Sequence, residues 1–366
     1  MQLTTLRENF LKVMGLVAQA VSPRPNLPVL ANFLLEADAG HLTLTGTNLE
    51  TTIKHRMAVK VSNGGKTTVS ARLLQDFCQS AAGDNIELKM EKDNLLVEVG
   101  NAVAKIPVIS PQEFPSVGQF DPEDSISIDK KDFIESMAQT AMCAAPEEGR
   151  PVLTGVLLNS DGKTATLVAT DGYRLAKKEL KAKGTVNAII PSRALREGAK
   201  AISEQADEEV KISINKDKNQ LQLETKNLSL LTRLIDGAYP NYEQIIPASF
   251  VSEITVNTKE FADAIKLTAL FARDVGNVVR LDFSSKNVTV SARTTQVGEA
   301  QTTIATKHKG DKMQIAFNSR FLSDCLSALS SRETSISLSG LTSAALIKGA
   351  NEKDLIYIVM PVRTQG

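Results

Sequence analysis

The chain has 366 residues, enough for two or three domains, and 42% of them are hydrophobic, so a sizeable core is expected rather than disorder. Its 42 basic and 42 acidic residues leave no net charge, which disfavours a strongly basic nucleic-acid binder but leaves room for a local basic surface. Only 4% of the residues are aromatic and none is Trp, which argues against a stacking platform for single strands.

The cysteines and histidines give no sign of a disulfide framework or a metal site. Cys78, Cys143 and Cys325 are odd in number and far apart, which indicates free thiols in a reducing compartment. The three histidines show no spacing typical of metal ligands. No long apolar run and no signal-peptide pattern is found, so we expect a cytoplasmic protein without contact to a membrane.

Taken in chain order, the predicted elements recur three times. Each repeat begins with a helix that contains Phe10, Phe133 or Phe261, and these residues are 123 and 128 positions apart. An alternating strand, a second helix introduced by an arginine, and a proline after a bulky apolar residue then follow in each repeat; the landmarks are Thr43, Thr166 and Thr289, then Arg72, Arg193 and Arg320, then Pro115, Pro240 and Pro361. The sequence therefore predicts three homologous domains at 1–121, 126–247 and 254–366.

Alternating strands with two helices per repeat favour an α+β fold with antiparallel sheet. Residues that resemble capping boxes precede the first helices, and serines precede the second helices; they are Thr5, Asp129 and Asn257, and Ser70, Ser192 and Ser319. Asn63-Gly64 predicts a hairpin turn. The adjacent Gly65-Lys66-Thr67 lacks the upstream glycine of a phosphate-binding loop, so the turn is the favoured interpretation.

The stretch VATDGYRLA, residues 168–176, is the sharpest candidate for chemistry. Asp-Gly suits a tight turn at the end of a strand, and Arg174 can pair with a nearby carboxylate. A hydrolase that uses Asp171 and Arg174 is the alternative, but the sequence offers no tuned base beside them. The sequence motif is also not repeated in the other two domains, so structure or binding is favoured over catalysis.

Arg193, Arg196 and Lys200 follow the helical period and share one face of a predicted helix. Leu195, Ala199 and Ile202 fall on the opposite face. Such a charged face is either a solvated surface or a set of phosphate contacts, and the residues alone leave both interpretations open.

Motifs from all three repeats resemble the bacterial DNA polymerase III β subunit, the sliding-clamp family, along the whole chain. They are RPNLPVLANFLLEA (24–37), LTGVLL (153–158), VATDGYRLA (168–176), LIDGAYPNYEQIIP (234–247), FNSRFL (317–322) and YIVMPVR (357–363). The resemblance implies three clamp domains per chain, each with two helices on antiparallel sheet, and two chains joined head to tail in a ring. It further implies a processivity factor that encircles duplex DNA and slides along it, with no catalysis and no cofactor of its own.

The resemblance also implies three sets of site residues. A pocket for short client peptides would be formed by Leu153, Thr170, Gly172, Tyr173, Arg174, Leu175, Pro240, Ile245, Asn318, Phe321, Val359, Met360, Pro361, Val362 and Arg363. DNA-facing residues would be Arg24, Arg72, Arg150 and Arg193, to which the helix face adds Arg196 and Lys200. The apolar dimer interface would include Ile106, Leu270 and Phe271.

The partners implied are duplex DNA without sequence preference, a second copy of the chain, the replicative polymerase, a clamp loader that consumes ATP, and other polymerases and repair proteins. The chain departs from the family pattern at Tyr173, where many members have His, at Gln244 and Gly276 on the pocket rim, and in the tail Thr364–Gly366. A monomeric repeat scaffold without a DNA role is the remaining alternative, and the mass in solution distinguishes it from a clamp.

Overall fold

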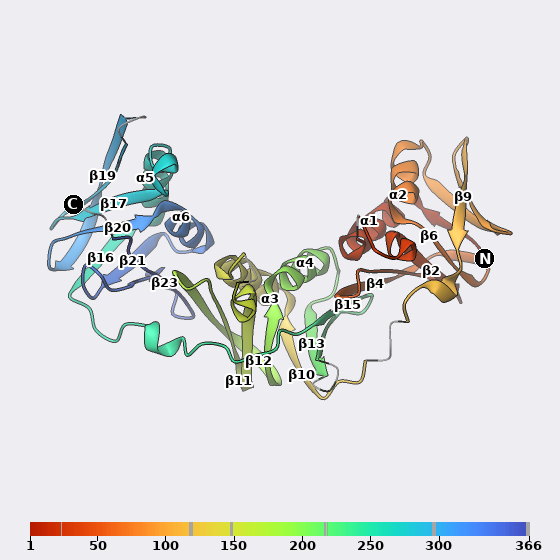
Figure 1. Cartoon of the computed structure of the whole chain (residues 1–366), viewed down its shortest axis with the longest axis horizontal. Coiled ribbons are helices and arrows are strands. Elements are labelled where there is room, and N and C mark those ends of the chain that lie inside the picture. The colour runs from red at the N-terminus through yellow and green to blue at the C-terminus, as the bar shows by residue number, and fades with distance from the viewer. Residues whose placement is uncertain are drawn as a thin grey trace. The chain divides into compact units, whose positions relative to one another are not determined.

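The computed structural model describes residues 1–22, 24–116, 120–146, 149–215, 217, 219–294 and 298–363, so the Thr364–Gly366 tail lies outside the described residues. The chain forms two compact units, one of Met1–Ile134 with Glu197–Leu234 and one of Glu135–Arg196 with Ile235–Gly366 (Figure 1). Within the described ranges, no helix combines the length and the apolar character needed to cross a bilayer.

The first repeat alternates strands with two helices. In order, its elements are β1 (Gln2–Leu6), α1 (Arg7–Val17), η2 (Pro28–Ala31), β2 (Asn32–Asp38), β3 (His41–Thr47), β4 (Thr51–Ala58), β5 (Lys60–Asn63), β6 (Gly65–Ser70), α2 (Ala71–Ser80), β7 (Asn85–Glu91), β8 (Asn94–Val99) and β9 (Ala102–Ile109).

The second and third repeats use the same plan with some strands fused. The second contains β10 (Asp124–Asp129), α3 (Lys130–Thr140), η4 (Ala141–Cys143), η5 (Pro151–Thr154), β11 (Gly155–Thr170), β12 (Arg174–Pro191), α4 (Ser192–Ser203), β13 (Glu209–Asn215), β14 (Gln220–Glu224) and β15 (Leu228–Arg233). The third contains β16 (Ser252–Asn257), α5 (Thr258–Ala269), β17 (Val278–Phe283), β18 (Asn287–Thr294), β19 (Gly298–Gly310), β20 (Met313–Asn318), α6 (Ser319–Ala328), β21 (Glu333–Leu338), β22 (Ala345–Gly349) and β23 (Leu355–Val359).

Strand pairs join neighbouring repeats into continuous antiparallel sheet. Within the first unit, β4 pairs with β3 on one side and with β15 of the second repeat on the other. Within the second unit, β12 pairs with β11 and with β23 of the third repeat. Because each shared pair lies inside one unit, the second repeat is divided between the two units. The α+β fold with antiparallel sheet is confirmed.

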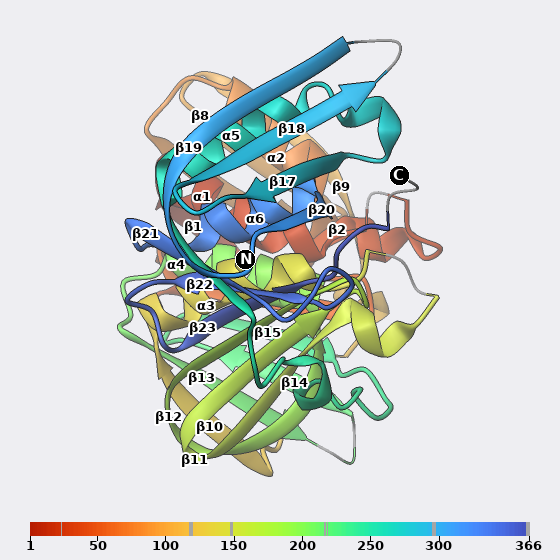
Figure 2. The same cartoon turned by 90° about the vertical axis from the view of Figure 1, so that its left-hand side faces the viewer.

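The helices cover the sheets with their apolar faces. The landmark side chains Phe10, Phe133 and Phe261 are all 0% exposed, so the repeated phenylalanine is a core residue of each repeat. In Figure 2, α5 lies beside β17, β18 and β19, and these three strands run next to one another. Along α4, Leu195 is buried, while Arg193 lies on the exposed face. The periodicity therefore predicted both faces of these helices correctly.

Several local predictions differ from the structure. The prediction that Thr5 caps α1 is wrong, because Thr5 belongs to β1 and the N-cap Leu6 has no side-chain cap. Asp129 and Asn257 do cap their helices, accepting from the backbone N–H of Asp132 and of Glu260 at 3.1 Å each. For the second helices, Ser70 caps α2.

Two further predictions concern the end of β20 and the Asn-Gly turn. Asn318, rather than the predicted Ser319, caps α6, since Ser319 is already the first helical residue. The predicted hairpin at Asn63-Gly64 is wrong, because β5 pairs with β1 whereas β6 pairs with β2 and β9. The chain thus continues in one direction and changes partners at Gly64. Lys66 and Thr67 lie on β6, so no phosphate-binding loop forms there.

Candidate functional site

The turn at the end of β11 is held by its own side chains. The Thr170 hydroxyl donates to the Arg174 carbonyl oxygen at 2.6 Å and accepts from the Gly172 N–H at 3.1 Å. One carboxylate oxygen of Asp171 accepts from the N–H groups of Tyr173 and Arg174, both at 2.9 Å. Gly172 has φ +91°, a left-handed conformation that glycine adopts without steric cost. The interpretation of Asp-Gly as a tight turn is confirmed.

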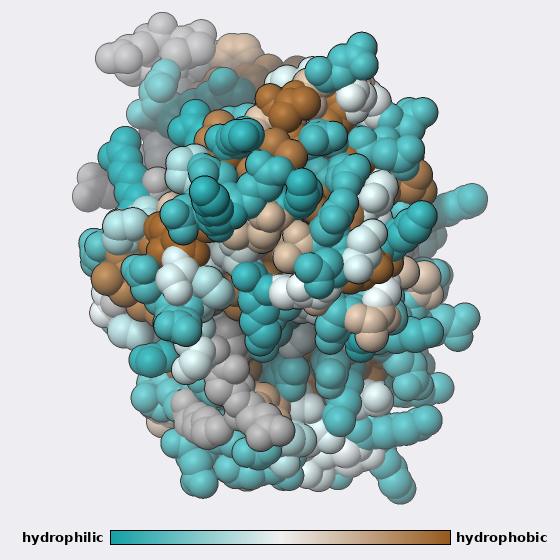
Figure 3. Space-filling model, turned by 90° about the vertical axis from the view of Figure 1, so that its right-hand side faces the viewer, coloured by the Kyte–Doolittle hydropathy of each residue, from teal (hydrophilic) through white to brown (hydrophobic). Residues whose placement is uncertain are grey.

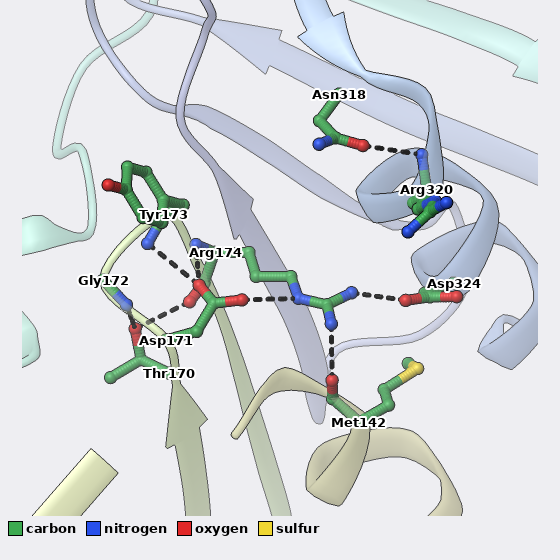
Figure 4. A network of polar contacts seen from close by, with 9 residues as sticks. All are labelled: Met142, Thr170, Asp171, Gly172, Tyr173, Arg174, Asn318, Arg320 and Asp324. Atoms are coloured by element: carbon green, nitrogen blue, oxygen red, sulfur yellow. Dashed lines mark hydrogen bonds and ion pairs between the residues drawn. The ribbon is translucent and has the colours of Figure 1, made fainter. Parts of the chain in front are cut away.

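The Arg174 side chain is directed into the protein, as Figure 4 shows. Its Nε donates to Asp171 at 3.0 Å, and its terminal nitrogens donate to Asp324 at 2.5 Å and to the Met142 carbonyl oxygen at 2.6 Å. The guanidinium carbon also lies 4.5 Å from the centre of the Phe321 ring, within the range of a cation–π contact. The side chains of Arg174 and Asp171 are only 13% and 11% exposed. Neither group is placed to act on a substrate, which argues against the hydrolase alternative.

The C-terminal segment runs alongside this turn. β23 pairs with β12 so that Val359 lies opposite Arg174, and the Met360 N–H then donates to the Tyr173 carbonyl oxygen at 2.8 Å. Val359 is 1% exposed, whereas the side chains of Tyr173 and Met360 are 67% and 37% exposed. The backbone is therefore fixed by the protein, while two large side chains are left on the surface.

A cluster of buried apolar side chains lies next to this turn. Leu175 and Ile358 are each 1% exposed and belong to it, together with Val168, Ala344 and Leu346. The segment that connects the second and third repeats packs partly buried side chains against the cluster; they are Tyr239, Tyr242, Ile246 and Phe250. The predicted site residues Pro240 and Ile245 lie on the same connecting segment and are exposed.

The remaining predicted pocket residues also lie in the second unit. Leu153 is 5% exposed on η5. Asn318 caps α6 by accepting from the Arg320 N–H at 2.9 Å, and in the described residues neither Leu153 nor Asn318 is hydrogen-bonded to the turn. Of the C-terminal residues, the Val362 N–H donates to the Ala316 carbonyl oxygen at 2.8 Å. Pro361 and Val362 are half-buried and Arg363 is exposed, as are Gln244 and Gly276, where the chain departs from the family pattern.

Sequence reasoning missed Asp324 and Met142, which complete the Arg174 network. Asp324 lies on α6 one turn after Phe321, so both residues meet Arg174 from the same helix. Met142 contributes only its backbone carbonyl oxygen. Because Asp324 is 150 residues from Arg174, no local pattern in the sequence could have paired them.

The backbone of this turn is duplicated in the first repeat, although its sequence is not. The Thr47 hydroxyl accepts from the Leu49 N–H at 3.1 Å and donates to the Thr51 carbonyl oxygen at 3.3 Å. The Asn48 side chain accepts from the N–H groups of Glu50 and Thr51 at 3.0 and 2.7 Å. Leu49 has φ +76° at the position of the glycine. The two turns differ in the side chains they display, since leucine, glutamate and threonine replace glycine, tyrosine and arginine.

The predicted DNA-facing residues are all exposed. In the first unit, Arg24 lies just before η2, Arg72 lies in the first turn of α2, and Lys200 lies near the end of α4. Arg72 pairs with Asp76 at 3.6 Å, and its side chain is 93% exposed. In the second unit, Arg150 precedes η5, and Arg193 and Arg196 lie on the first turns of α4.

The predicted interface residues differ in exposure. Leu270 is 50% exposed and Phe271 is half-buried just after α5, where Leu267 is also 52% exposed. Ile106 is only 2% exposed, because its side chain points into its own unit from β9. Its neighbour Val103 is 59% exposed on the same strand. The side of the molecule that carries β9 shows such apolar side chains among hydrophilic ones (Figure 3).

Chemical sites of other kinds were not found in the described residues. No group of three or more His, Cys, Asp or Glu side chains there is arranged to hold a metal ion. The three cysteines are buried, and burial raises the pKa of the Cys78 and Cys143 thiols to about 12. Thiols with such pKa values are poor nucleophiles near neutral pH.

Comparison with known proteins covers nearly the whole chain. Residues 1–118, 127–241 and 243–363 match the N-terminal, central and C-terminal domains of the DNA polymerase III beta subunit. The beta sliding clamp of Pseudomonas aeruginosa is 30% identical over 99% of this chain and all of its own length, and that of Synechococcus elongatus is 31% identical over 98% and 99%. A solved sliding clamp of Bartonella birtlesii bound to griselimycin has a TM-score of 0.94 at 27% identity, covering both chains completely.

Proposed function

We propose, from the premise that the chain belongs to the DNA polymerase III beta subunit family, that it encircles duplex DNA, slides along it and tethers the replicative polymerase. The premise rests on the match of all three domain models. The matching relatives are beta sliding clamps, which are not catalysts, so the chain is a processivity factor and not an enzyme. We further propose that it acts in the cytoplasm without a cofactor, with domain boundaries at 1–121, 126–247 and 254–366.

The surface formed by the turn of the second repeat and the C-terminal segment is the proposed docking site for client peptides. One observation carries this assignment: internal hydrogen bonds fix the backbone here, while Tyr173 and Met360 stay exposed beside a buried apolar cluster. A fixed apolar surface takes up large side chains of an extended peptide at low entropic cost. Methionine adapts to several partners, and an affinity of about 1 μM would let clients exchange.

A second observation supports a dimer. In two repeats, the strand after the turn pairs with the last strand of the following repeat, as β4 does with β15 and β12 with β23. The equivalent strands without such a partner are β19 and β9. In the described chain, residues 298–305 of β19 pair only with β18, and residues 102–107 of β9 pair only with β8. Open strand edges favour pairing with another chain, so β9 of one copy is expected to pair with β19 of a second.

The existing pairs also predict the register of that contact. Counted from the β14–β15 hairpin, in which Thr232 lies opposite the first residue of β4, the first residue of β19 lies opposite Ile106 of the other copy. In that register, Ala300 lies opposite Ala104, and the carboxylate of Glu299 lies opposite the ammonium group of Lys105. Two copies joined in this way use both open edges of each chain, and a closed ring follows.

Cysteine cross-linking tests the dimer and its register together. The native cysteines are buried, so a variant with Ala104→Cys and Ala300→Cys is expected to form a disulfide-linked dimer on mild oxidation. Lys105→Cys with Ala300→Cys is the matched control, because its side chains would lie on opposite faces of the sheet. Equal cross-linking of both variants, or a monomer by light scattering at every concentration, would refute the pairing. Loading the reduced double variant with a clamp loader and ATP, and then oxidising it, tests encirclement, because the covalently closed ring should be retained on circular but not on linear DNA.

Client binding is tested with a C-terminal peptide of a replicative polymerase. Tyr173→Ala combined with Met360→Ala is expected to weaken peptide binding at least tenfold in calorimetry, because both side chains are exposed and make the apolar surface. Leu341→Ala, which removes another exposed apolar side chain of the same unit, is the control and should leave the affinity unchanged. Undiminished binding by the double variant would place the peptide elsewhere.

The basic residues are proposed to contact DNA phosphates. They are Arg24, Arg72, Arg150, Arg193, Arg196 and Lys200, and all are exposed. Phosphate contacts of exposed side chains are weak, indifferent to sequence and sensitive to salt, as sliding requires. The dependence of duplex binding on salt should therefore become shallower when these residues are replaced by alanine.

A further inference from the structure

The first unit contains a cavity of which the proposed clamp function uses only Lys200, one of the residues proposed to contact DNA. Its volume is about 830 Å³, within the range of roughly 300–1,000 Å³ found for small-molecule sites. It lies between α1, β4 and the end of α4, where the loop between β14 and β15 closes one side. Most of its lining residues come from these four segments, Gln19 and His41 add to them, and none belongs to the proposed peptide site.

Positive charge predominates around the cavity. Four cations line it, Lys12, Arg56, Lys200 and Lys226, against one carboxylate, Glu204. Arg56 is 4.0 Å from a carboxylate of Asp38 and therefore weakly paired, and in the described chain Lys200 and Lys226 form no ion pair. Several cations that converge on one cavity repel one another unless an anion lies between them. The charges therefore point to an anionic occupant.

The wall also holds a histidine whose hydrogen bonds are incomplete. His55 is 7% exposed, and its Nε2 lies 3.2 Å from Oε1 of Gln205. Since the Gln205 amide nitrogen donates to the Ala201 carbonyl oxygen at 3.3 Å, Oε1 must accept, and Nε2 of His55 must carry the proton. Nδ1 is then an acceptor, and it has no partner in the described structure. Burial lowers the pKa of His55, which favours this neutral form.

The floor of the cavity is apolar. Val13, Leu16 and Met57 are 6%, 7% and 8% exposed, and Ala58 adjoins them on β4. The cavity suits a compact ligand with an apolar ring for the floor, a negative charge for the cations and a hydrogen-bond donor for Nδ1 of His55. A duplex offers phosphates at its surface and does not need a recess of this kind.

We propose that this cavity binds a nucleotide-sized organic phosphate. Its phosphate would lie among Arg56, Lys200 and Lys226, its ring would lie on Val13 and Met57, and a hydroxyl or amino group would donate to Nδ1 of His55. The proposal is independent of the clamp function, because the wild-type chain would bind the ligand whether or not it forms a ring.

Calorimetry with dAMP and dTMP tests the proposal on the full chain. Saturable binding is expected in the millimolar range or tighter, and both deoxyadenosine and inorganic phosphate should bind at least tenfold more weakly. Arg56→Ala combined with Lys226→Ala should weaken binding of the monophosphate at least tenfold. Lys163→Ala, an exposed lysine of the second unit, is the control and should not change it.

Three outcomes would overturn the proposal. The first is no saturable binding of either monophosphate, and the second is equal binding by the double variant and the control. The third outcome distinguishes DNA from a free ligand. If the double variant binds a short DNA duplex more weakly but binds the monophosphates as well as the wild type does, the cations contact the DNA backbone and not a free nucleotide. Unchanged circular dichroism and an unchanged urea midpoint of the first unit would show that the double variant is folded.

Discussion

Replacing Arg174 by alanine should destabilise the second unit far more than the loss of an ordinary surface charge. The substitution leaves the Asp171 carboxylate, 11% exposed, without its cation, and it leaves the Met142 carbonyl oxygen without its donor. Breaking a buried ion pair by removing one partner costs about 3–5 kcal/mol. Asp324 adds less than about 1 kcal/mol, because its side chain is 43% exposed and becomes solvated.

Urea denaturation followed by circular dichroism measures this cost, since the chain has no Trp for fluorescence. With a slope of about 3 kcal/mol/M, the midpoint of the transition of the second unit should fall by about 1–2 M, whereas that of the first unit should not move. Arg320→Ala, an exposed arginine on α6, is the control and should shift the midpoint by no more than about 0.2 M. Equal shifts for the two variants would refute the view that Arg174 holds the site together.

Three further predictions concern the backbone of the turns, the buried His55 and the cysteines. Gly172→Ala should cost about 1 kcal/mol through its φ of +91° alone, since no atom lies within 4 Å of the added methyl group, whereas Leu49→Gly at φ +76° should not destabilise the chain in the same denaturation assay. The pKa of His55 is lowered in the folded state, so the neutral side chain contributes to the free energy of unfolding fully above pH 6.5, and this contribution is lost as the pH falls below that value. The urea midpoint of the first unit should therefore decline from pH 6.5 to 5, and it should decline less steeply in the His55→Gln variant. The three buried cysteines should resist a thiol reagent at pH 8 in the native protein and react fully in urea, so fast native labelling would contradict their burial.

The periodic features of the fold could be predicted from the sequence. The first helices could be predicted from Phe10, Phe133 and Phe261, because the buried residues of an amphipathic helix recur with the helical period in the sequence. All three side chains are fully buried. The strands could be predicted for the same reason, because their buried and exposed residues alternate in the sequence. The change of pairing partner from β1 for β5 to β2 for β6 could not be predicted, because the local Asn-Gly signal is the same whether the chain turns back or continues.

The candidate site could be predicted only in part from the sequence. Its turn could be predicted, since Asp171 and Gly172 carry the signal locally. Asp324 could not, because it meets Arg174 only through the folding of residues 150 positions apart. The matching turn of the first repeat was missed for a different reason. Asn48 accepts the same backbone hydrogen bonds as Asp171 with an amide oxygen in place of a carboxylate, so the two turns share no sequence motif.

The two open strand edges have a consequence for the direction of assembly. β9 and β19 are different surfaces, so in the proposed dimer each contact between copies would join unlike partners. Both contacts of the two-chain ring would then run in the same rotational sense. Such a ring has two unequal sides, and the symmetry axis passes through its hole. Both peptide sites would then open toward the same side, and two clients would approach the same stretch of DNA from one direction, as neighbours that can replace each other without leaving the ring.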